Sequence, residues 1–348
     1  MSLQFEPTLP VEQRALAQFL ISVFRASPAA PFVDPTLIWW KYFEPYTDWN
    51  GPRSIVLKQD GEIVAHGGVF PVTFLTESRE VKAIHLIDWA ASPKAPGAGV
   101  LLIRKLAGLT DTFLTVGGSI ETQQILPKIG FKRRSDLQLY ARVVRPWAQF
   151  RARPFTGWNA PIRLARNVLW SLPSLPSIPK EWSAARISQF DESVLPLLAS
   201  RRTGEFTPCK RSLAMLNYML RCPGARFRAF LLLRGKDLRG YFILSWIGGQ
   251  CRVADVLLNS NDSADWRSAY AVATRVAADN PDTCEVETVS SIQLATDAIL
   301  ENGFRLRDRC PIFLCDAKGL LADSPPLHIN LLDGEGSYLS DPAHPFLT

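Results

Sequence analysis

The alternation of apolar and polar positions predicts a chain that begins with helices and continues as a mixed sheet. Helical periodicity occurs at 11–24 and 35–43, and strand-like runs occur at 53–58, 63–74 and 84–91. Gln59-Asp60-Gly61 is a hairpin turn sequence, so the first three strands should be antiparallel. The later strand–helix–strand steps require parallel pairing. We therefore expect an α+β fold, a mixed and mostly antiparallel sheet with helices on both faces.

The second half of the chain repeats this order. Tyr42 is matched by Tyr218, 176 residues later, and Phe131 by Phe304, 173 residues later. Between them, an aspartate in an apolar run recurs (Asp88, then Asp255), as does a Ser-Ile pair at a helix start (Ser119-Ile120, then Ser291-Ile292). A shared order with so little drift indicates the duplication of one unit.

Composition shifts divide the chain into four parts. We expect a first domain at 1–145, a connector at 146–181 rich in proline, tryptophan and arginine, a second domain at 182–318 and a tail at 319–348. Repeated prolines predict an extended connector with one short helical window at 161–172. A membrane or nucleic-acid patch is one interpretation of this connector, and packing of its tryptophans between the domains is the other. Packing is favoured, because an amphipathic membrane helix would be longer and free of prolines.

Composition excludes several classes of protein. The 348 residues are 47% hydrophobic and 21% charged, which is typical of globular proteins and not of disordered ones. No apolar run approaches the ~18 residues of a membrane span, and the first residues do not resemble a secretory signal, so we expect a cytoplasmic protein. The six cysteines and four histidines lack a metal-binding spacing, so no metal is expected. The net charge of +6 is scattered and fits an anionic ligand as well as nucleic acid.

The segment from Ser92 to Val100 has the pattern of a ligand-binding turn. It joins a strand to a helix, and Gly97 and Gly99 lack the Cβ atom that would keep a ligand away from the backbone. The amides that begin a helix attract phosphate, and Lys94 adds a cation. A simple strand-to-helix turn explains this segment equally well. Neither a P-loop nor a dinucleotide fingerprint is present.

At this turn the sequence resembles the GCN5-related N-acetyltransferases. Lys94-Ala95-Pro96-Gly97-Ala98-Gly99 is similar to the Gln/Arg-x-x-Gly-x-Gly/Ala motif of that family. Three more segments resemble family motifs: Ala90-Ala91-Ser92-Pro93, Ile125-Leu126-Pro127-Lys128-Ile129-Gly130-Phe131, and Trp40-Lys41-Tyr42 with Pro45. The resemblance covers 11–143, and a weaker copy covers 184–315.

The resemblance implies a donor, acetyl-CoA or another acyl-CoA. Its diphosphate would lie on the turn formed by Lys94, Gly97, Ala98, Gly99 and Val100. Its pantetheine arm would pair with backbone at Ala90, Ala91 and Ser92, where two strands splay apart, and Ser119 would lie across the splay. For Ser119, the alternative is a helix cap. We expect no nucleic-acid partner, and an amine acceptor that is a small molecule or a peptide.

Transfer of an acyl group requires an amine that has lost its proton. Asp88 is the first candidate for the base, because burial in an apolar run would raise its pKa. Alternation predicts Asp88 on the strand face of Ile84, Leu86 and Ala90, with His85, the second candidate, on the opposite face. Asp88 could equally be a structural carboxylate, which Asp255 at the matching place favours. For His85, as for His66 in the neighbouring strand, a core role is the alternative.

Two departures from the family pattern limit these predictions. Leu126 stands where many members have a tyrosine that protonates the leaving thiolate, so the general acid is unassigned. The second copy has no glycine and two aspartates at 259–265, so it should not bind the donor.

We therefore expect an acyl-CoA-dependent N-acyltransferase whose first domain holds the donor. The alternatives are an aminoacyl transferase of the tandem cell-wall peptide type and a non-catalytic binding protein of the same fold. The acceptor, the acyl length and the oligomeric state stay open.

Overall fold

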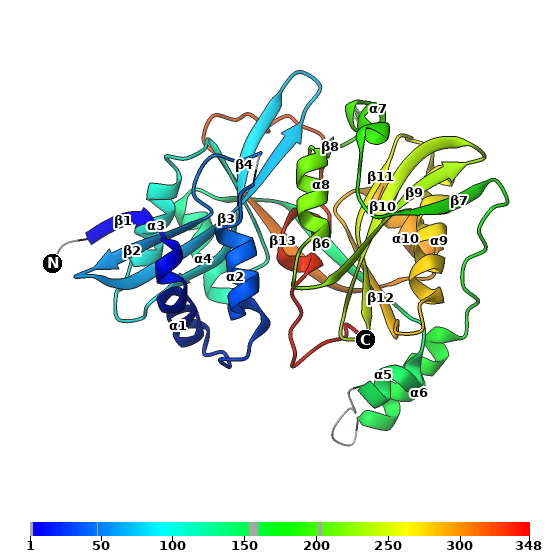
Figure 1. Ribbon diagram of the computed structural model, residues 1–348, viewed down its shortest axis with the longest axis horizontal. Coiled ribbons are helices and arrows are strands. Elements are labelled where there is room, and N and C mark those ends of the chain that lie inside the picture. Colours follow the sequence, from blue (N-terminus) through cyan, green and yellow to red (C-terminus); the bar gives the residue numbers. More distant parts are fainter. Residues whose placement is uncertain (1–2, 47, 153–158, 201–203) are drawn as a thin grey trace. The chain divides into compact units, whose positions relative to one another are not determined.

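The computed structural model describes residues 3–46, 48–152, 159–200 and 204–348 (Figure 1). These residues form two compact units. The first unit comprises Met1–Ser135, Cys222–Gly224 and Pro311–Ser324, and the second comprises Asp136–Arg221, Ala225–Cys310 and Pro325–Thr348. The division differs from a linear one, because residues 136–145 belong to the second unit and 311–318 to the first.

Strands of the first unit form the mixed sheet expected from the sequence. They are β1 (Leu3–Pro7), β2 (Ser54–Gln59), β3 (Glu62–Leu75), β4 (Glu80–Ala91) and β5 (Thr112–Val116). The first four pair antiparallel in chain order, and β5 is parallel to β4. Asp60 and Gly61 both have positive φ, at 51° and 88°, as a two-residue hairpin turn requires. The antiparallel pairing of β2, β3 and β4 and the parallel step to β5 are confirmed. Strand β1 was not expected, and the expected parallel pairing of the next step is wrong, because β5 pairs antiparallel with β13 (Arg305–Asp316).

Helices cover both faces of this sheet. On one face lie α1 (Gln13–Phe24) and α2 (Pro35–Tyr42), after the short turns η1 (Pro10–Glu12) and η2 (Pro31–Val33). The other face packs against α3 (Ala98–Leu106) and η3 (Leu126–Ile129), which follows α4 (Ile120–Ile125). The alternation in β2 explains the two cores: Ile55 and Leu57 pack on the α3 side, and Val56 packs on the α1–α2 side.

The second unit repeats the order of the first. Its strands are β7 (Trp182–Ile187), β9 (Arg226–Arg234), β10 (Asp237–Ile247), β11 (Gln250–Leu258) and β12 (Glu285–Ser290), with a small pair of β8 (Thr207–Pro208) and β14 (Leu327–His328). Its helices are α5 (Pro146–Ala152), α6 (Ala160–Ser171), α7 (Leu195–Ala199), α8 (Leu213–Leu220), α9 (Ser263–Asp279) and α10 (Gln293–Glu301), with turns η4 (Glu192–Val194), η5 (Leu331–Asp333) and η6 (Glu335–Ser337). As in the first unit, four strands that pair antiparallel in chain order (β7, β9, β10 and β11) precede one parallel step, from β11 to β12.

Each unit takes its final sheet strand from the other half of the sequence. Strand β6 (Lys132–Val143) ends the first repeat, but its residues 138–143 pair antiparallel with β12 in the second unit. Strand β13 (Arg305–Asp316) ends the second repeat, but its residues 312–316 pair antiparallel with β5 in the first unit. The two repeats therefore exchange strands, which nothing in the apolar pattern predicts.

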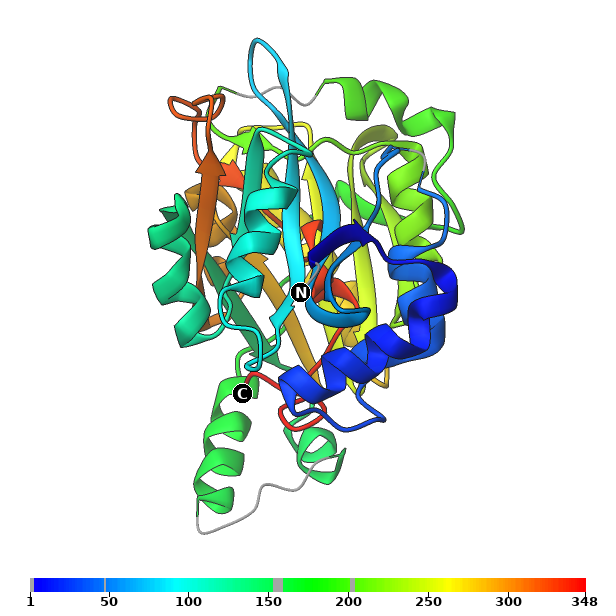
Figure 2. The same ribbon diagram turned by 90° about the vertical axis from the view of Figure 1, so that its left-hand side faces the viewer.

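The connector contains more helix than its prolines predict. Two helices, α5 and α6, occupy it, and Pro146 and Pro161 lie in their first turns, where proline is tolerated. The predicted burial of the tryptophans is wrong for Trp147, whose side chain is 61% exposed. Arg153, Pro154 and Trp158 lie outside the described residues. Figure 2 shows α5 and α6 as a hairpin that projects from the rest of the second unit.

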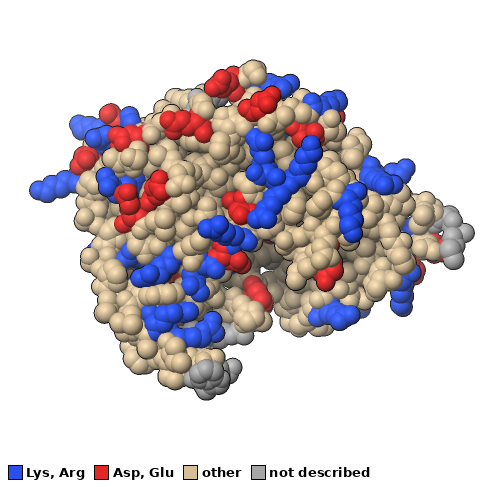
Figure 3. Space-filling view, turned by 180° about the vertical axis from the view of Figure 1, so that it is seen from behind, with Lys and Arg blue, Asp and Glu red and all other residues tan. Residues whose placement is uncertain are grey.

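Surface charge is mixed on the face drawn in Figure 3, where basic and acidic side chains are intermingled. Within the described part of the chain, no helix is long and apolar enough to cross a membrane. The same residues contain no group of histidine, cysteine, aspartate or glutamate side chains arranged to hold a metal ion. The cysteines, all described, form no disulfide.

Candidate donor site

Strands β4 and β5 diverge after a short parallel contact. Their paired residues are Ile84 with Phe113 and His85 with Leu114, although β4 continues to Ala91. On its other edge β4 stays paired with β3 as far as Ala91, and the Ser92 N–H donates to the Val64 carbonyl at 2.8 Å. The β5-side edge of residues 86–91 therefore lies beyond the ladder. This is the splay that the sequence resemblance leads one to expect.

A β-bulge interrupts β4 inside the splay. Asp88 has a φ of 44°, and the β3–β4 register shifts so that Asp88 and Trp89 both lie opposite Gly67. One extra residue reverses the alternation of side chains. Leu86 packs on the α3 side of the sheet, whereas Ala90, four residues later, packs on the α1–α2 side.

Because of the bulge, the side chains of Asp88 and His85 do not lie on the opposite sheet faces that strict alternation predicts. Asp88 bonds to side chains of α2 and so shares a face with Ala90, as predicted, but not with Ile84 and Leu86, which face α3. His85 alternates with those two residues and therefore lies on the Asp88 face. The prediction that His85 lies opposite Asp88 is wrong. His85 is buried, at the last residue of β4 that pairs with β5.

The glycine turn leaves amides available at the start of α3. Gly97, with a φ of 84°, is the N-cap, and a Cβ atom built on it would meet nothing within 4 Å. The Ala98 N–H donates to the Ala95 carbonyl at 3.1 Å. Among the described residues, the amides of Gly97, Gly99 and Val100 have no acceptor. The turn therefore has open space at Gly97 and three amides that no backbone acceptor uses, although Gly99 itself is buried.

Trp89 joins the bulge to this turn. Its indole Nε1 donates to the Gly99 carbonyl at 3.2 Å. A Cβ atom on Gly99 would lie 3.1 Å from both the Trp89 Nε1 and the Ala91 Cβ. Glycine at 99 thus allows the helix to approach the end of β4. The sequence reading missed Trp89, because nothing local distinguishes it from a core tryptophan.

Asp88 is held by two side chains of α2. Lys41 forms an ion pair with its Oδ2, and the Tyr42 hydroxyl donates to the same oxygen. The side chains of Lys41 and Asp88 are only 2% and 8% exposed. Burial by itself would raise the pKa of Asp88, but the Lys41 charge and the hydrogen bonds from Lys41 and Tyr42 outweigh it, so the pKa is lowered. The predicted rise in the pKa is therefore wrong.

His66 supports the bulge from β3. Its Nδ1 lies 2.9 Å from the Asp88 carbonyl oxygen, which can only accept, so Nδ1 carries the proton. Its Nε2 lies 3.0 Å from the Ser54 hydroxyl, which lies 2.7 Å from the Thr8 hydroxyl. Complete burial lowers the pKa of His66 to about 4 despite the nearby Asp88, so the imidazole is neutral at pH 7.

Ser119 and Leu126 have structural roles in this fold. Ser119 is exposed and caps α4, its hydroxyl accepting from the Thr122 N–H at 3.2 Å. The capping alternative is therefore confirmed, while a contact with a donor stays a prediction. Leu126 is fully buried in the α3-side core, so this position supplies no proton donor.

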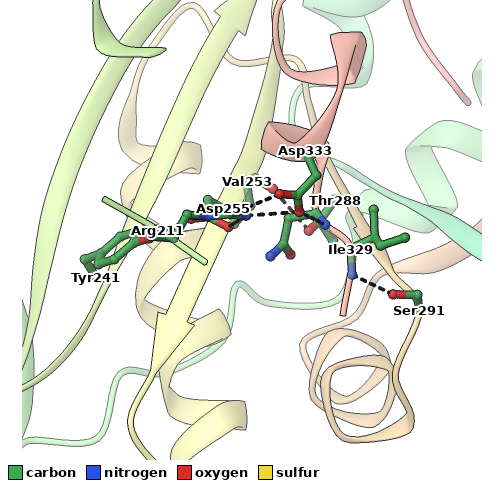
Figure 4. A network of polar contacts seen from close by, with 9 residues as sticks. Arg211, Tyr241, Val253, Asp255, Thr288, Ser291, Ile329 and Asp333 are labelled. Atoms are coloured by element: carbon green, nitrogen blue, oxygen red, sulfur yellow. Dashed lines mark hydrogen bonds and ion pairs between the residues drawn. The ribbon is translucent and has the colours of Figure 1, made fainter. Parts of the chain in front are cut away.

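The matching splay in the second unit is occupied by the chain itself. Strands β11 and β12 pair only at residues 250–252 and 285–287. Ser291, the counterpart of Ser119, donates to the Leu327 carbonyl at 2.7 Å and accepts from the Ile329 N–H at 2.9 Å. Arg211 links Asp255 of β11 to Asp333 of the same C-terminal segment (Figure 4). Residues 327–333 are thus bonded to both sides of the splay.

The helix after the second splay caps itself. The Asp262 carboxylate accepts from the Ala264 N–H at 2.9 Å at the start of α9. Asp265 follows in the first turn, where the Ser260 hydroxyl donates to it at 2.8 Å. Arg234 and Arg239 form ion pairs with Asp265, so its charge is compensated within the unit. The Asp262 carboxylate therefore takes the place at the Ala264 amide that a phosphate would need.

Comparison with known structures extends over most of the chain. No family model matches the sequence, and no curated protein is similar to it. A GCN5-related N-acetyltransferase from Anabaena variabilis ATCC 29413 is similar over 91% of this chain and 73% of its own, with 13% identity and a TM-score of 0.61. A tandem GNAT protein from the clavulanic acid biosynthesis pathway is similar over 91% of this chain and 99% of its own, with 13% identity and a TM-score of 0.56.

The fold is that of a tandem GCN5-related N-acetyltransferase. The N-myristoyltransferase of Saccharomyces cerevisiae, solved with myristoyl-CoA and inhibitors, also has a similar structure. The similarity covers 90% of this chain and 80% of the N-myristoyltransferase, with 12% identity and a TM-score of 0.62. The GNAT fold recognised from the turn and the repeats is thereby confirmed, as is the α+β class.

Proposed function

We propose that the first unit binds an acyl-CoA and transfers its acyl group to an amine. The observation that carries this proposal is the combination of a β4–β5 splay with a turn that offers three amides at its end. Neighbouring structures are described as acetyltransferases and as an N-myristoyltransferase with myristoyl-CoA, which supports the same donor class. At their low identity these neighbours support the fold directly and the reaction only by analogy.

The donor would lie along the end of β4. Its diphosphate would accept from the amides of Gly97, Gly99 and Val100, where the dipole of α3 adds partial positive charge. The exposed Lys94 would add a mobile cation beside it. The pantetheine amides would continue the sheet along the β4 backbone at Ala90, Ala91 and Ser92, where β5 has diverged. The thioester would then reach the bulge.

The reaction is a direct attack by an amine nitrogen on the thioester carbonyl. The C–N bond forms, the C–S bond breaks, and the leaving thiolate takes up a proton. Asp88 is a poor acceptor for the amine's proton, because it is already paired with Lys41 and its pKa is lowered. We therefore assign Asp88, Lys41 and Tyr42 a positioning role: they hold the bulge that turns the β4 backbone toward the thioester. A proton-transfer role for His85 stays a prediction.

Calorimetric titration with acetyl-CoA and longer acyl-CoAs tests the donor site. A glutamate at Gly97 would place a carboxylate near the diphosphate, which costs about 1–4 kcal/mol at about 4 Å. Affinity should therefore fall about five-fold to about a thousand-fold. Gly61→Glu is the matched control, because Gly61 also has a positive φ, 88°, and open space around it. Absence of binding by the wild type, or equal losses in both variants, would remove the proposed site.

Thiol release across a panel of amines separates an enzyme from a passive binder. We expect acyl-CoA-dependent release that requires an amine and falls with Gly97→Glu in proportion to donor binding. Saturable acyl-CoA binding without any release would instead identify a binding protein that has kept the fold.

A further inference from the structure

The end of β6 and the connector that follows it carry a one-sided charge as far as Glu181, the last residue of the connector. Residues 137–180 contain seven basic residues and no aspartate or glutamate. Arg142 and Arg145 are bonded to backbone carbonyls of the second unit, so they hold the connector in place. Arg151 and Arg163, in contrast, are exposed on α5 and α6. The projecting part of the connector is therefore basic.

Further arginines gather around Trp170 of α6. The guanidinium of Arg166 lies 4.4 Å from the ring centroid, and those of Arg305 and Arg307 each lie 5.0 Å away. All four residues belong to the second unit. Three cations around one indole form a positively charged group next to the exposed Arg163.

Helix α6 and its C-cap residue Leu172 present four apolar residues to solvent, whereas Leu164 and Val168 of the same helix are half-buried. Ile162, Ala165, Leu169 and Leu172 are spaced as one stripe of a helix, and all four are exposed. The large ones are 59% (Ile162), 63% (Leu169) and 69% (Leu172) exposed. The buried contact of the helix is polar: Asn167 donates to the Gln149 side chain of α5 at 2.9 Å. The exposed stripe therefore differs from the apolar face of a helix that packs on its own core, which would be buried.

We propose that the α5–α6 hairpin docks on the surface of an anionic lipid bilayer. An apolar stripe flanked by arginines, with Trp147 exposed on the adjoining helix, fits the boundary between headgroups and acyl chains. Arginines beside the stripe would reach the phosphates while their stems lie along the acyl region. The docking is peripheral, because the helix spans only Ala160–Ser171. The proline that argued against a membrane helix in the sequence, Pro161, lies in the first turn of α6, where it does not interrupt the helix.

Charge and chemistry favour a bilayer over other partners. In a symmetric dimer through this face, the same basic segment would meet its own copy and repel it. Nucleic acid would satisfy the arginines but would leave the aliphatic stripe in water. An anionic bilayer provides both a negative surface and an apolar layer.

Sedimentation with lipid vesicles tests this proposal on the full-length protein. The probes are vesicles of phosphatidylcholine alone and of equal parts phosphatidylcholine and phosphatidylglycerol. We expect binding to the anionic vesicles only, with binding reduced by salt. Each arginine near the surface should contribute about five-fold, equivalent to about 1 kcal/mol, so Arg151→Gln/Arg163→Gln should weaken binding by about 25-fold. Leu169→Glu/Leu172→Glu should abolish it.

Matched variants on another surface of the second unit provide the control. Arg267→Gln/Arg275→Gln removes the same charge from α9, where both arginines are exposed and ion-paired, and should leave binding unchanged. Circular dichroism verifies that each variant is folded. Equal binding by the two arginine variants, or none to anionic vesicles, would overturn the proposal. It would also fail if the wild type formed a dimer that Leu169→Glu/Leu172→Glu separates, or bound an oligonucleotide in preference to the vesicles.

Discussion

Replacing Lys41 by methionine should leave the carboxylate of Asp88 charged inside the first unit. Methionine has a similar length and keeps the apolar contacts of the lysine stem, so the main loss is the positive charge. Both side chains are almost fully buried. Removal of one partner from such a pair costs about 3–5 kcal/mol of unfolding free energy, because the other charge remains desolvated.

The pH dependence of stability should change sign in this variant. In the wild type the pKa of Asp88 is lowered, so the pair contributes stability that is present above the unfolded pKa, near 3.8, and is lost as the pH falls through the lower folded pKa. Without Lys41, burial dominates and the folded pKa rises above the unfolded one. The folded state then binds the proton more tightly, so the unfolding free energy of Lys41→Met should increase as the pH is lowered from 7 toward 5.

Urea unfolding between pH 5 and pH 8 measures both effects. Lys58→Met is the control, because Lys58 pairs with Glu6 and Glu12 nearer the surface and should cost about 1 kcal/mol or less. Lys41→Met/Asp88→Asn should recover much of the loss at pH 7, because no charge is left without a counter-ion. If Lys41→Met loses no more stability than Lys58→Met, or follows the wild-type pH profile, the buried pair is not ionised as described.

Three further outcomes follow from the same geometry. Loss of a general base slows a reaction by about 10²-fold or more. Asp88→Asn should slow thiol release by less than this and should keep the shape of the pH–rate profile. A variant that no longer shows the wild-type dependence of the rate on pH would identify Asp88 as the base. Acyl-CoA should bind at one site per chain in calorimetry, and Ser291→Ala should not add a second site. A second site in either protein would show that the second splay is accessible. Arg211→Met, which removes the cation shared by Asp255 and Asp333, should cost about 3–5 kcal/mol in urea unfolding, and a loss below about 1 kcal/mol would contradict the ionic link.

Local signals explain the parts of the fold that the sequence predicts. The Asp60-Gly61 hairpin and the turn at Gly97 depend on backbone conformations that few residues adopt, so their residues identify them. The duplication was visible because whole elements recur in the same order. The capping role of Ser119 likewise depends on a contact only three residues away.

Non-local contacts explain what the sequence does not predict. The bulge adds one residue to β4 without a distinctive motif, and it reversed the predicted face of His85. The pKa of Asp88 depends on Lys41, which is 47 residues away in the chain. Strands β6 and β13 have the pattern of any sheet strand, so their apolar residues cannot show which repeat they join.

The two aspartates show how the cationic partner of each determines whether the C-terminal segment is held across the splay. Asp88 and Asp255 occupy matching strands, and each has a cationic partner and a tyrosine donor. Lys41 has a single ammonium group, which forms an ion pair with Asp88 on the α1–α2 side of the sheet. Arg211 brings a planar fork, which can bind two carboxylates at once. It binds Asp255 and also Asp333, and so fixes the C-terminal segment across the second splay. Arg211 donates four hydrogen bonds to the two carboxylates, one more than the three N–H groups of a lysine could donate. The arginine thus ties closure of the second splay to the stability of the second unit.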